Sequence, residues 1–204
     1  MIKKPHIIFF KNLLIIFFFS SQIFSQQLTN LEKIYELIDN SGKDISLIIK
    51  SRNEEFGLKL SCPAELNILE QRVRFAFSRE SLNFNKNTPL SEAVLNYNVD
   101  NAGINYKRVF KDGWFGDLLV EREAVLKGTF VLESKGMFLK SDKFEYAELD
   151  TVKLDDISKL ENMSLPFTKN EVPPEPFFSG LLEPVIAVGT AVVTVILFFT
   201  VRSK

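Results

Sequence analysis

Apolar positions along this chain repeat with a helical period in its first part and with a strand period in its middle. Residues 29–40 carry apolar side chains every three or four positions, which is typical of an amphipathic helix. Thr29 can cap the start of this helix, because its hydroxyl accepts a hydrogen bond from the first turn. Ser41 and Gly42 are expected to end it.

Two short strands are expected next, over 44–50 and 56–60, because apolar and polar residues alternate there. The apolar side of the first strand consists of Ile45, Leu47 and Ile49. Residues 63–80 fit both periods, since some of their apolar residues also alternate as in a strand. A helix over 63–79 is favoured, because the helical match is longer and Pro63 stands in the first turn, where proline is tolerated.

From residue 90 onward the period is two, which predicts a meander of long antiparallel strands. The expected strands cover residues 93–99, 104–108, 118–133 and 137–149. Residues 100–103 can form a turn or a β-bulge, 134–136 a turn, and 155–162 a short capped helix. With about two helices of the first half packed on one face of this antiparallel sheet, the fold class is α+β.

Both ends of the chain are apolar. Residues 185–201 carry no charge, and 181–201 reach the roughly 20 residues that a helix needs to cross a bilayer. We therefore expect a transmembrane helix there, with a basic tail over 202–204; the alternative is a buried helix of a soluble protein. Residues 1–25 have a basic start, an apolar core and a small, polar end, as in a signal peptide cleaved after Ser25. An uncleaved N-terminal anchor is the alternative.

A signal peptide combined with a C-terminal stop-transfer helix fixes the orientation of the chain. A domain over 27–163 is exported, while Arg202 and Lys204 stay in the cytoplasm, as the positive-inside rule expects. In a Gram-negative cell this is a single-pass protein of the inner membrane with a periplasmic domain. Residues 164–180 contain four prolines and are expected to form a stiff linker that keeps the domain close to its membrane.

Composition removes several classes of function. The 204 residues carry a formal net charge of −1 and no cluster of basic residues, so nucleic acid is not an expected partner. Cys62 is the single cysteine, which excludes a disulfide within the chain. His6, in the signal peptide, is the single histidine, so imidazole catalysis and ordinary zinc sites are not expected in the exported domain. No cofactor is predicted.

Two sets of residues are candidates for binding a protein partner. Small and polar residues form one stripe along the predicted transmembrane helix, a pattern that lets membrane helices approach closely. The stripe consists of Glu183, Ala187, Thr190, Ala191 and Thr194. Trp114 and Phe115 lie between two glycines at a predicted loop tip, where exposed aromatic side chains suit contact with a protein or with the membrane interface. The alternative is that these two residues fold back and cap the sheet.

One pair of carboxylates lies within a predicted strand. Glu121 and Glu123 share a face, opposite Arg122, because alternate residues of a strand point the same way. Two carboxylates at a suitable separation can hydrolyse a glycoside. A solvated strand face is the favoured interpretation of this pair.

The layout of the chain resembles that of exported bacterial envelope proteins with a signal peptide, a small α+β domain and a tail anchor. The proline-containing segment 166–178 and the final residues VRSK carry this resemblance, which implies a place in the envelope but no particular activity. The sequence therefore predicts a non-catalytic binding or assembly protein. The alternatives are a hydrolase that uses carboxylates or a metal held by oxygen ligands, and a carrier or sensor for an apolar ligand, which needs a cavity between helices and sheet.

Overall fold

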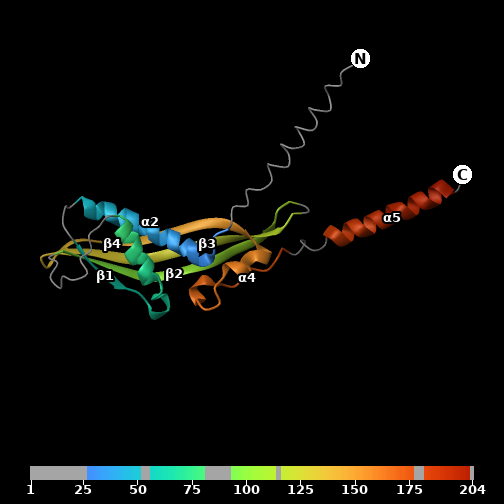
Figure 1. The fold of residues 1–204 in the computed structure, drawn as a ribbon. Helices are drawn as coiled ribbons and strands as arrows, with labels where there is room; N and C mark the ends of the chain where they lie inside the picture. The colour runs from blue at the N-terminus through green and yellow to red at the C-terminus, as the bar shows by residue number, and fades with distance from the viewer. Residues whose placement is uncertain (1–26, 52–55, 81–92, 114–115, 177–181, 203–204) are drawn as a thin grey trace, which may run out of the picture.

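The computed structural model describes residues 27–51, 56–80, 93–113, 116–176 and 182–202, so the predicted signal peptide lies outside the described part. The order of elements is α2 (Asn30–Lys50), β1 (Phe56–Ser61), the 3₁₀ turn η1 (Ala64–Leu66), α3 (Leu69–Arg79), β2 (Ala93–Lys111), β3 (Leu118–Ser134), β4 (Met137–Lys153), η2 (Leu154–Asp156), α4 (Ile157–Leu160), η3 (Pro166–Thr168) and α5 (Leu182–Arg202). Figure 1 shows an elongated sheet with α2 lying along one face.

A four-stranded sheet in the order β1-β2-β3-β4 forms the centre of the domain. Strands β2, β3 and β4 form the predicted antiparallel meander, whereas β1 pairs with β2 in parallel. The parallel pair requires a crossover, and α3 lies in the connection between the two strands. The α+β fold class is therefore confirmed, with β1 as the one exception to the antiparallel pattern within the described sheet.

The strand predicted over residues 44–50 is wrong, because α2 continues through them. Ile45 and Ile49 are both buried, four positions apart on one helix face, whereas Leu47 is 59% exposed. Residues four apart lie on the same side of a helix, and they also lie on the same side of a strand. The two isoleucines therefore fitted both structures, and only Leu47 distinguishes between them.

Helix α2 continues through Gly42, so this glycine does not end it as predicted. Its role is in packing. A Cβ atom at Gly42 would lie 3.0 Å from the Cβ atom of Ala76, so the two small residues let α2 and α3 approach closely. Ser41 is fully buried, donates a hydrogen bond to the carbonyl of Ile38 and lies 2.7 Å from the hydroxyl of Tyr97. The contacts with Ala76 and Tyr97 join residues far apart in the sequence, so local pattern alone could not reveal them.

The start of α2 and the presence of α3 agree with the sequence. Thr29 caps α2 in a reciprocal box with Glu32: the backbone N–H of Glu32 donates to the Thr29 hydroxyl at 3.3 Å, and the N–H of Thr29 donates to the carboxylate at 2.7 Å. The helix favoured over 63–79 is confirmed from Leu69 to Arg79 as α3, whereas Ala64–Leu66 form the separate 3₁₀ turn η1. Phe77 is buried and Phe75, which would share its side in a strand, is 50% exposed.

One irregular position of the meander matches a predicted break. Strand β2 runs on through residues 100–103, and its pairing with β3 shifts between Val99 and Asn101, so the bulge formed rather than the turn. The helix expected over 155–162 is present in shorter form as η2 and α4. The strands are longer than expected, because β4 continues to Lys153.

Residues 166–170, which the sequence places in the linker, lie against β2. Thr168 is buried, and the side-chain amide of Asn170 donates to the carbonyl of Ile104 at 2.8 Å. Strand β1 pairs only with residues 93–98 of β2, so the rest of that edge needs another cover. The segment supplies part of it, and the folded domain includes these residues.

The core fills the space between the helices and the sheet. Its largest fully buried apolar side chains are Tyr97, Phe77, Ile34, Ile38, Ile45, Ile49, Leu69, Leu95, Ile104, Leu126 and Leu132. Aromatic rings form its centre: Tyr97 stacks on Phe144 with 4.9 Å between ring centroids and meets Phe77 edge-on at 5.4 Å. Such packing leaves one face of the sheet covered and the other open to solvent.

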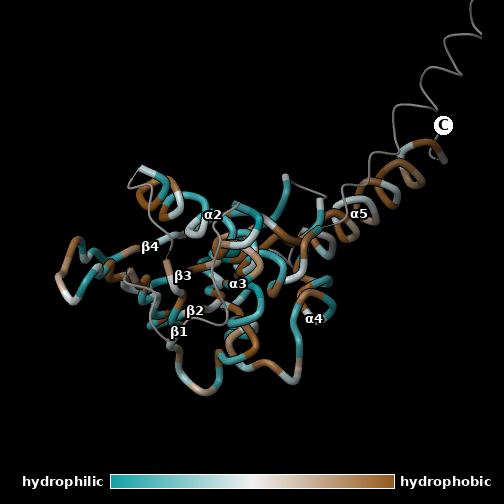
Figure 2. Tube along the Cα trace, turned by 60° about the vertical axis from the view of Figure 1, so that its left-hand side comes forward, coloured by the Kyte–Doolittle hydropathy of each residue, from teal (hydrophilic) through white to brown (hydrophobic). Residues whose placement is uncertain are grey.

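The C-terminal helix α5 is apolar and lies apart from this core. Its segment Pro184–Val201 has a mean hydropathy of 2.4, and 0% of it is buried against the rest of the protein. Figure 2 shows mostly hydrophobic colour along α5, whereas the colour along the chain of the domain alternates between hydrophilic and hydrophobic. By length and composition this helix can cross a membrane.

Candidate functional site

The sheet has two ends, which differ in chemistry. At the first, which we call the clamp end, β2 passes through the loop 112–117 into β3, and β4 finishes beside them; Lys111 pairs with Leu118 here. At the second, which we call the tip end, β3 turns directly into β4 through residues 134–137. The candidate features of the domain lie at these two ends and on the open face between them.

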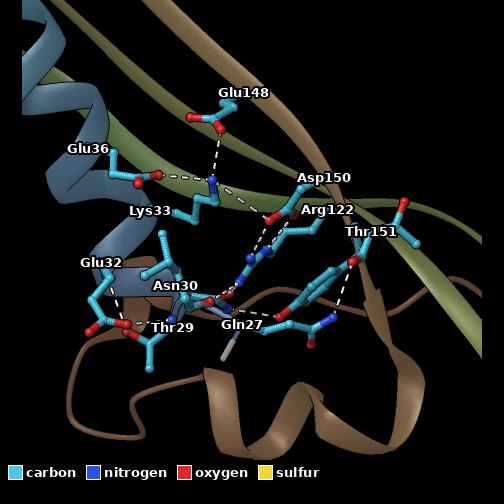
Figure 3. A network of polar contacts seen from close by, with 12 residues as sticks. Gln27, Thr29, Asn30, Glu32, Lys33, Glu36, Arg122, Glu148, Asp150 and Thr151 are labelled. Atoms are coloured by element: carbon cyan, nitrogen blue, oxygen red, sulfur yellow. Dashed lines mark hydrogen bonds and ion pairs between the residues drawn. The ribbon is translucent and has the colours of Figure 1, made fainter. Parts of the chain in front are cut away.

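Arg122 is the largest fully buried side chain in the domain, with 1% of the residue exposed. It projects from β3 toward the helices, between the buried Val120 and Ala124. Its Nε and Nη2 atoms donate to the two carboxylate oxygens of Asp150 on β4, at 2.8 and 2.5 Å (Figure 3). This is a bidentate pair, the strong and directional form of the arginine–carboxylate contact.

The remaining donor of Arg122 binds the segment where the chain enters the domain. Its Nη1 atom donates to the carbonyl of Leu28 at 2.9 Å and to the side-chain oxygen of Asn30 at 2.7 Å. Asn30 is fully buried, and its amide nitrogen donates to the hydroxyl of Tyr106 and to the carbonyl of Thr168. One asparagine therefore joins the first residues of the domain to its last ones.

Lys33 extends the same network toward solvent (Figure 3). Its ammonium group lies 2.7 Å from Glu148, 2.9 Å from Glu36 and 4.0 Å from Asp150. Burial lowers the pKa of Lys33 and is the largest single influence, but the hydrogen bonds and charges of Glu148 and Glu36 together raise it. We call Asn30, Lys33, Arg122 and Asp150 the clamp.

The clamp is built to hold parts of the chain together. Each of its charged groups has a partner of opposite charge, and the buried amide of Asn30 is bonded at both its oxygen and its nitrogen. Tyr106 bonds in turn to Glu161, and burial raises the pKa of its phenol to about 12, so this hydroxyl stays protonated. Groups that are mutually satisfied in this way stabilise a fold and leave little capacity for a substrate.

The carboxylates Glu121 and Glu123 lie on the open face of the sheet, as the alternation predicted, and each is paired with a basic residue. Glu121 binds Arg108 at 2.6 Å, and Glu123 binds Lys107 at 2.6 Å and Asn105 at 3.1 Å. The hydrogen bonds from Lys107 and Asn105 lower the pKa of Glu123. A glycosidase acid needs the opposite shift.

The predicted stripe on α5 is exposed along its described side chains. Ala187, Thr190, Ala191 and Thr194 all lie on the surface of the helix. The hydroxyl of Thr190 donates to the carbonyl of Ile186 and that of Thr194 to the carbonyl of Thr190, both at 2.8 Å, so their hydrogens are used within the helix. Glu183 lies in the first turn of α5. A role of this stripe in binding a partner stays a prediction.

Trp114 and Phe115 lie outside the described residues, so the prediction of an exposed aromatic pair stays untested. The residues on either side are described. The backbone N–H of Asp112 donates to the carbonyl of Asp117 at 3.0 Å, and Gly113 has a positive φ of 71°. The loop is therefore closed at its base and belongs to the clamp end.

The tip end carries two exposed apolar side chains that the sequence analysis missed. Met137 is 64% exposed and Phe138 is 77% exposed, directly after the hairpin turn. The signal was present in the sequence, because the apolar residues 137–139 stand between Lys135 and Lys140. The alternating pattern predicts a strand that begins at residue 137. It does not show that the first residues of this strand, next to the turn, are exposed.

Comparisons with known proteins give a distant resemblance in fold and no family. No family model matches the chain, and no curated protein matches it. Among solved structures, the chain is similar to a minor lipoprotein from Acinetobacter baumannii, with 14% identity, a TM-score of 0.34, and 50% of this chain and 68% of that chain covered. Likeness at this level carries no argument about function.

Proposed function

We propose that this chain is a membrane-anchored protein of the bacterial envelope that binds another envelope component through its domain and does not catalyse a reaction. Helix α5 is the proposed anchor. Its 21 residues reach about 31 Å as a helix, close to the hydrocarbon thickness of a bilayer of about 30 Å. None of its apolar segment is buried against the domain, so its side chains are free to face lipid.

The proposed orientation follows from the charges and apolar segments of the sequence. Residues 1–25 act as a signal peptide and Arg202 and Lys204 remain in the cytoplasm, which places the domain on the outer side of the inner membrane. The linker left between the folded domain and α5 covers residues 171–181. Extended at about 3.1 Å per residue, it spans at most about 34 Å.

The position where the chain enters and leaves the domain is the observation that carries the proposal. Leu28 is bound to Arg122 and Asn170 to Ile104, so both connections reach the half of the sheet that holds the clamp end. A membrane anchor that follows Asn170 therefore holds this end near the bilayer. The opposite end, with its exposed Met137 and Phe138, is presented away from it.

Both alternative functions lack support in the described residues. Glu121 and Glu123 are ion-paired on an open face, and no group of three or more His, Cys, Asp or Glu side chains in the described part is placed to hold a metal ion. A carrier needs an apolar cavity. The apolar hollow beside Cys62 and Tyr97 has a volume of about 10 Å³, room for roughly one water molecule.

Extraction and protease digestion test the anchor and its orientation. The full-length protein should stay in the membrane pellet after alkaline carbonate, and external protease should digest the domain in spheroplasts. A variant that ends at residue 176 should be released as soluble protein. Release of the full-length protein by carbonate, or protection of its domain in intact spheroplasts, contradicts the proposal.

A pull-down from native membranes in mild detergent tests the binding role. The tagged full-length protein is compared with a variant in which Glu183, Ala187 and Ala191 are changed to leucine. A stoichiometric partner lost in this variant assigns recognition to the anchor stripe, and one kept in both assigns it to the domain, with Trp114 and Phe115 tested next. Recovery of the protein alone in both cases counts against an assembly role.

A further inference from the structure

The hairpin tip, residues 135–140, is a rigid projection. Lys135 and Gly136 have φ values of 53° and 74°, as in a two-residue type I′ turn. Such a turn joins two paired strands directly, with no further loop residues. Ser134 pairs with Met137 directly behind this loop, and β3 and β4 stay paired to the clamp end apart from one bulge at Leu139. The side chains that follow the loop therefore project from the end of a stiff ladder.

The fold itself does not bury Met137 and Phe138 of the hairpin tip, whereas Leu139 is partly buried against the core. Phe138 is 77% exposed, whereas Phe144 on the same strand is buried and stacks on Tyr97. Met137 is 64% exposed. Two adjacent large apolar side chains held in water at the end of a hairpin indicate a contact with something outside the domain.

The apolar side chains of the hairpin tip do not share one face. Met137 and Phe138 are consecutive residues of β4, so their side chains point to opposite sides of the hairpin. Leu139 is the extra residue of a bulge, because Leu132 pairs with Lys140 while Glu133 pairs with Phe138. A protein partner docks on one side of a hairpin, whereas a bilayer surrounds an inserted tip on every side.

Charges at the hairpin tip suit an anionic surface. Residues 135–140 contain Lys135 and Lys140 and no acidic residue, and Glu133 lies opposite Phe138 just behind the loop. Lysine stems can lie along an apolar surface while the ammonium groups reach lipid phosphates. Lys140 already lies with its ammonium 5.8 Å from the ring centroid of Phe130, at the base of the tip. When the tip is inserted, the charge of Lys140 therefore lies at the level of the lipid headgroups.

From these observations we infer that the hairpin tip inserts into an anionic lipid surface. The 17 residues of β3 separate the tip from the clamp end by about 56 Å at 3.3 Å per residue. In the proposed arrangement the linker joins α5 to the clamp half of the sheet, and the surface that the tip meets belongs to a second bilayer, facing the one that holds α5. The claim that this surface is a second bilayer rests on the proposed function. Insertion into lipid is inferred from the hairpin tip alone.

Vesicle capture by the full-length protein tests this inference. The protein is inserted through α5 into nanodiscs of phosphatidylcholine, and these are floated with vesicles of either phosphatidylcholine alone or phosphatidylcholine with 30 mol% phosphatidylglycerol. The anionic vesicles should capture the nanodiscs and the neutral ones should not. Changing Met137 and Phe138 together to serine should weaken capture by at least about tenfold, as expected when two large apolar side chains are removed from lipid contact.

Two further variants separate the tip from general surface properties. Leu149→Ser removes a side chain of β4 that is 57% exposed but lies away from the tip, and it should leave capture unchanged. Changing Lys135 and Lys140 together to glutamine should reduce capture severalfold and should remove most of its dependence on salt. All variants change exposed or half-exposed positions, and an unchanged thermal midpoint shows that each has folded.

Three outcomes overturn the inference. The first is that anionic vesicles do not capture the wild type although it is stably held in nanodiscs. The second is equal loss of capture in the Leu149→Ser variant. The third is that the wild type ignores both kinds of vesicle while the serine variant of Met137 and Phe138 loses a protein partner in the pull-down, which assigns the tip to a protein. Failure to enter nanodiscs at all counts against the proposed function instead.

Discussion

The clamp end and the tip end of the same two strands, β3 and β4, have opposite designs. At the clamp end a charged side chain, Arg122, is 1% exposed and bonded through all of its donor nitrogens. At the tip end an apolar side chain, Phe138, is 77% exposed. Each reverses the usual rule that charge lies outside and apolar surface inside. The buried charge is explained by partners within the fold, and the exposed ring by a partner outside it.

This contrast shows which changes should affect stability and which should affect binding. Removing the buried arginine of the clamp leaves the acceptors around it, including the oxygen of the fully buried Asn30, without their donor, which is costly. Removing an exposed apolar side chain changes little within the fold. Substitutions should therefore lower the free energy of unfolding most at the clamp end and least at the tip end.

Arg122→Met should destabilise the domain most. It leaves Asp150 without its bidentate partner and removes the bond to Leu28, so we expect a loss of about 3–5 kcal/mol in the free energy of unfolding. Thermal and urea unfolding of the full-length protein in detergent, followed by circular dichroism, measures it. The matched control is Arg108→Met, whose side chain is 70% exposed in its pair with Glu121 and should cost below about 1 kcal/mol.

A double change sharpens this prediction. Replacing Arg122 and Asp150 together, by methionine and leucine, removes both charges and should recover a large part of the lost stability, because apolar residues often replace a buried ion pair without loss. Equal destabilisation by Arg122→Met and Arg108→Met contradicts the view that the clamp depends on burial.

The clamp also shows how far sequence reasoning reaches. Alternation placed Arg122 opposite Glu121 and Glu123, and the structure confirms that arrangement. The partner of Arg122 is Asp150, 28 residues along the chain, and its other contacts come from Leu28 and Asn30, more than 90 residues away. Local pattern gives the direction of a side chain but not the identity of the groups that meet it.

The errors in the helical part have the same origin. Glycine is common at helix ends, so the sequence predicts an end at Gly42. In the structure Gly42 instead packs against Ala76 of α3. The parallel pairing of β1 with β2 depends on the path of the chain through α3, which no period in the sequence records. Predictions held where neighbours in sequence decide the structure, as at the Thr29 cap.

The Thr29 cap itself gives a smaller prediction. Thr29→Ala removes the hydroxyl that accepts the N–H of Glu32, and N-cap changes of this kind cost about 1 kcal/mol. The same unfolding measurements check it. Thr129→Ala is a useful control, because this threonine lies on the half-exposed face of β3 and its hydroxyl accepts a hydrogen bond from the Asn98 side chain at 3.2 Å. An equal loss in both variants means that the cap has no special role.

Alkaline pH should weaken the clamp end. Burial raises the pKa of Tyr106 from 10.0 to about 12, so the folded protein favours the neutral phenol. Its contribution is complete below pH 10 and is lost as pH rises from there toward 12. The pKa of Lys33 is also raised, and its contribution is lost in the same direction. Tyr106→Phe should therefore flatten the fall in thermal midpoint between pH 9 and 11.5, relative to wild type.

The smallest effect on stability is expected at the tip end, where the change in binding is largest. Replacing Met137 and Phe138 by serine removes side chains that are 64% and 77% exposed, so the free energy of unfolding should change by no more than about 0.5 kcal/mol. Unfolding of wild type and variant under identical conditions checks this. A loss near that of Arg122→Met would mean that the tip supports the fold, and its exposure could no longer be explained by a partner outside the domain.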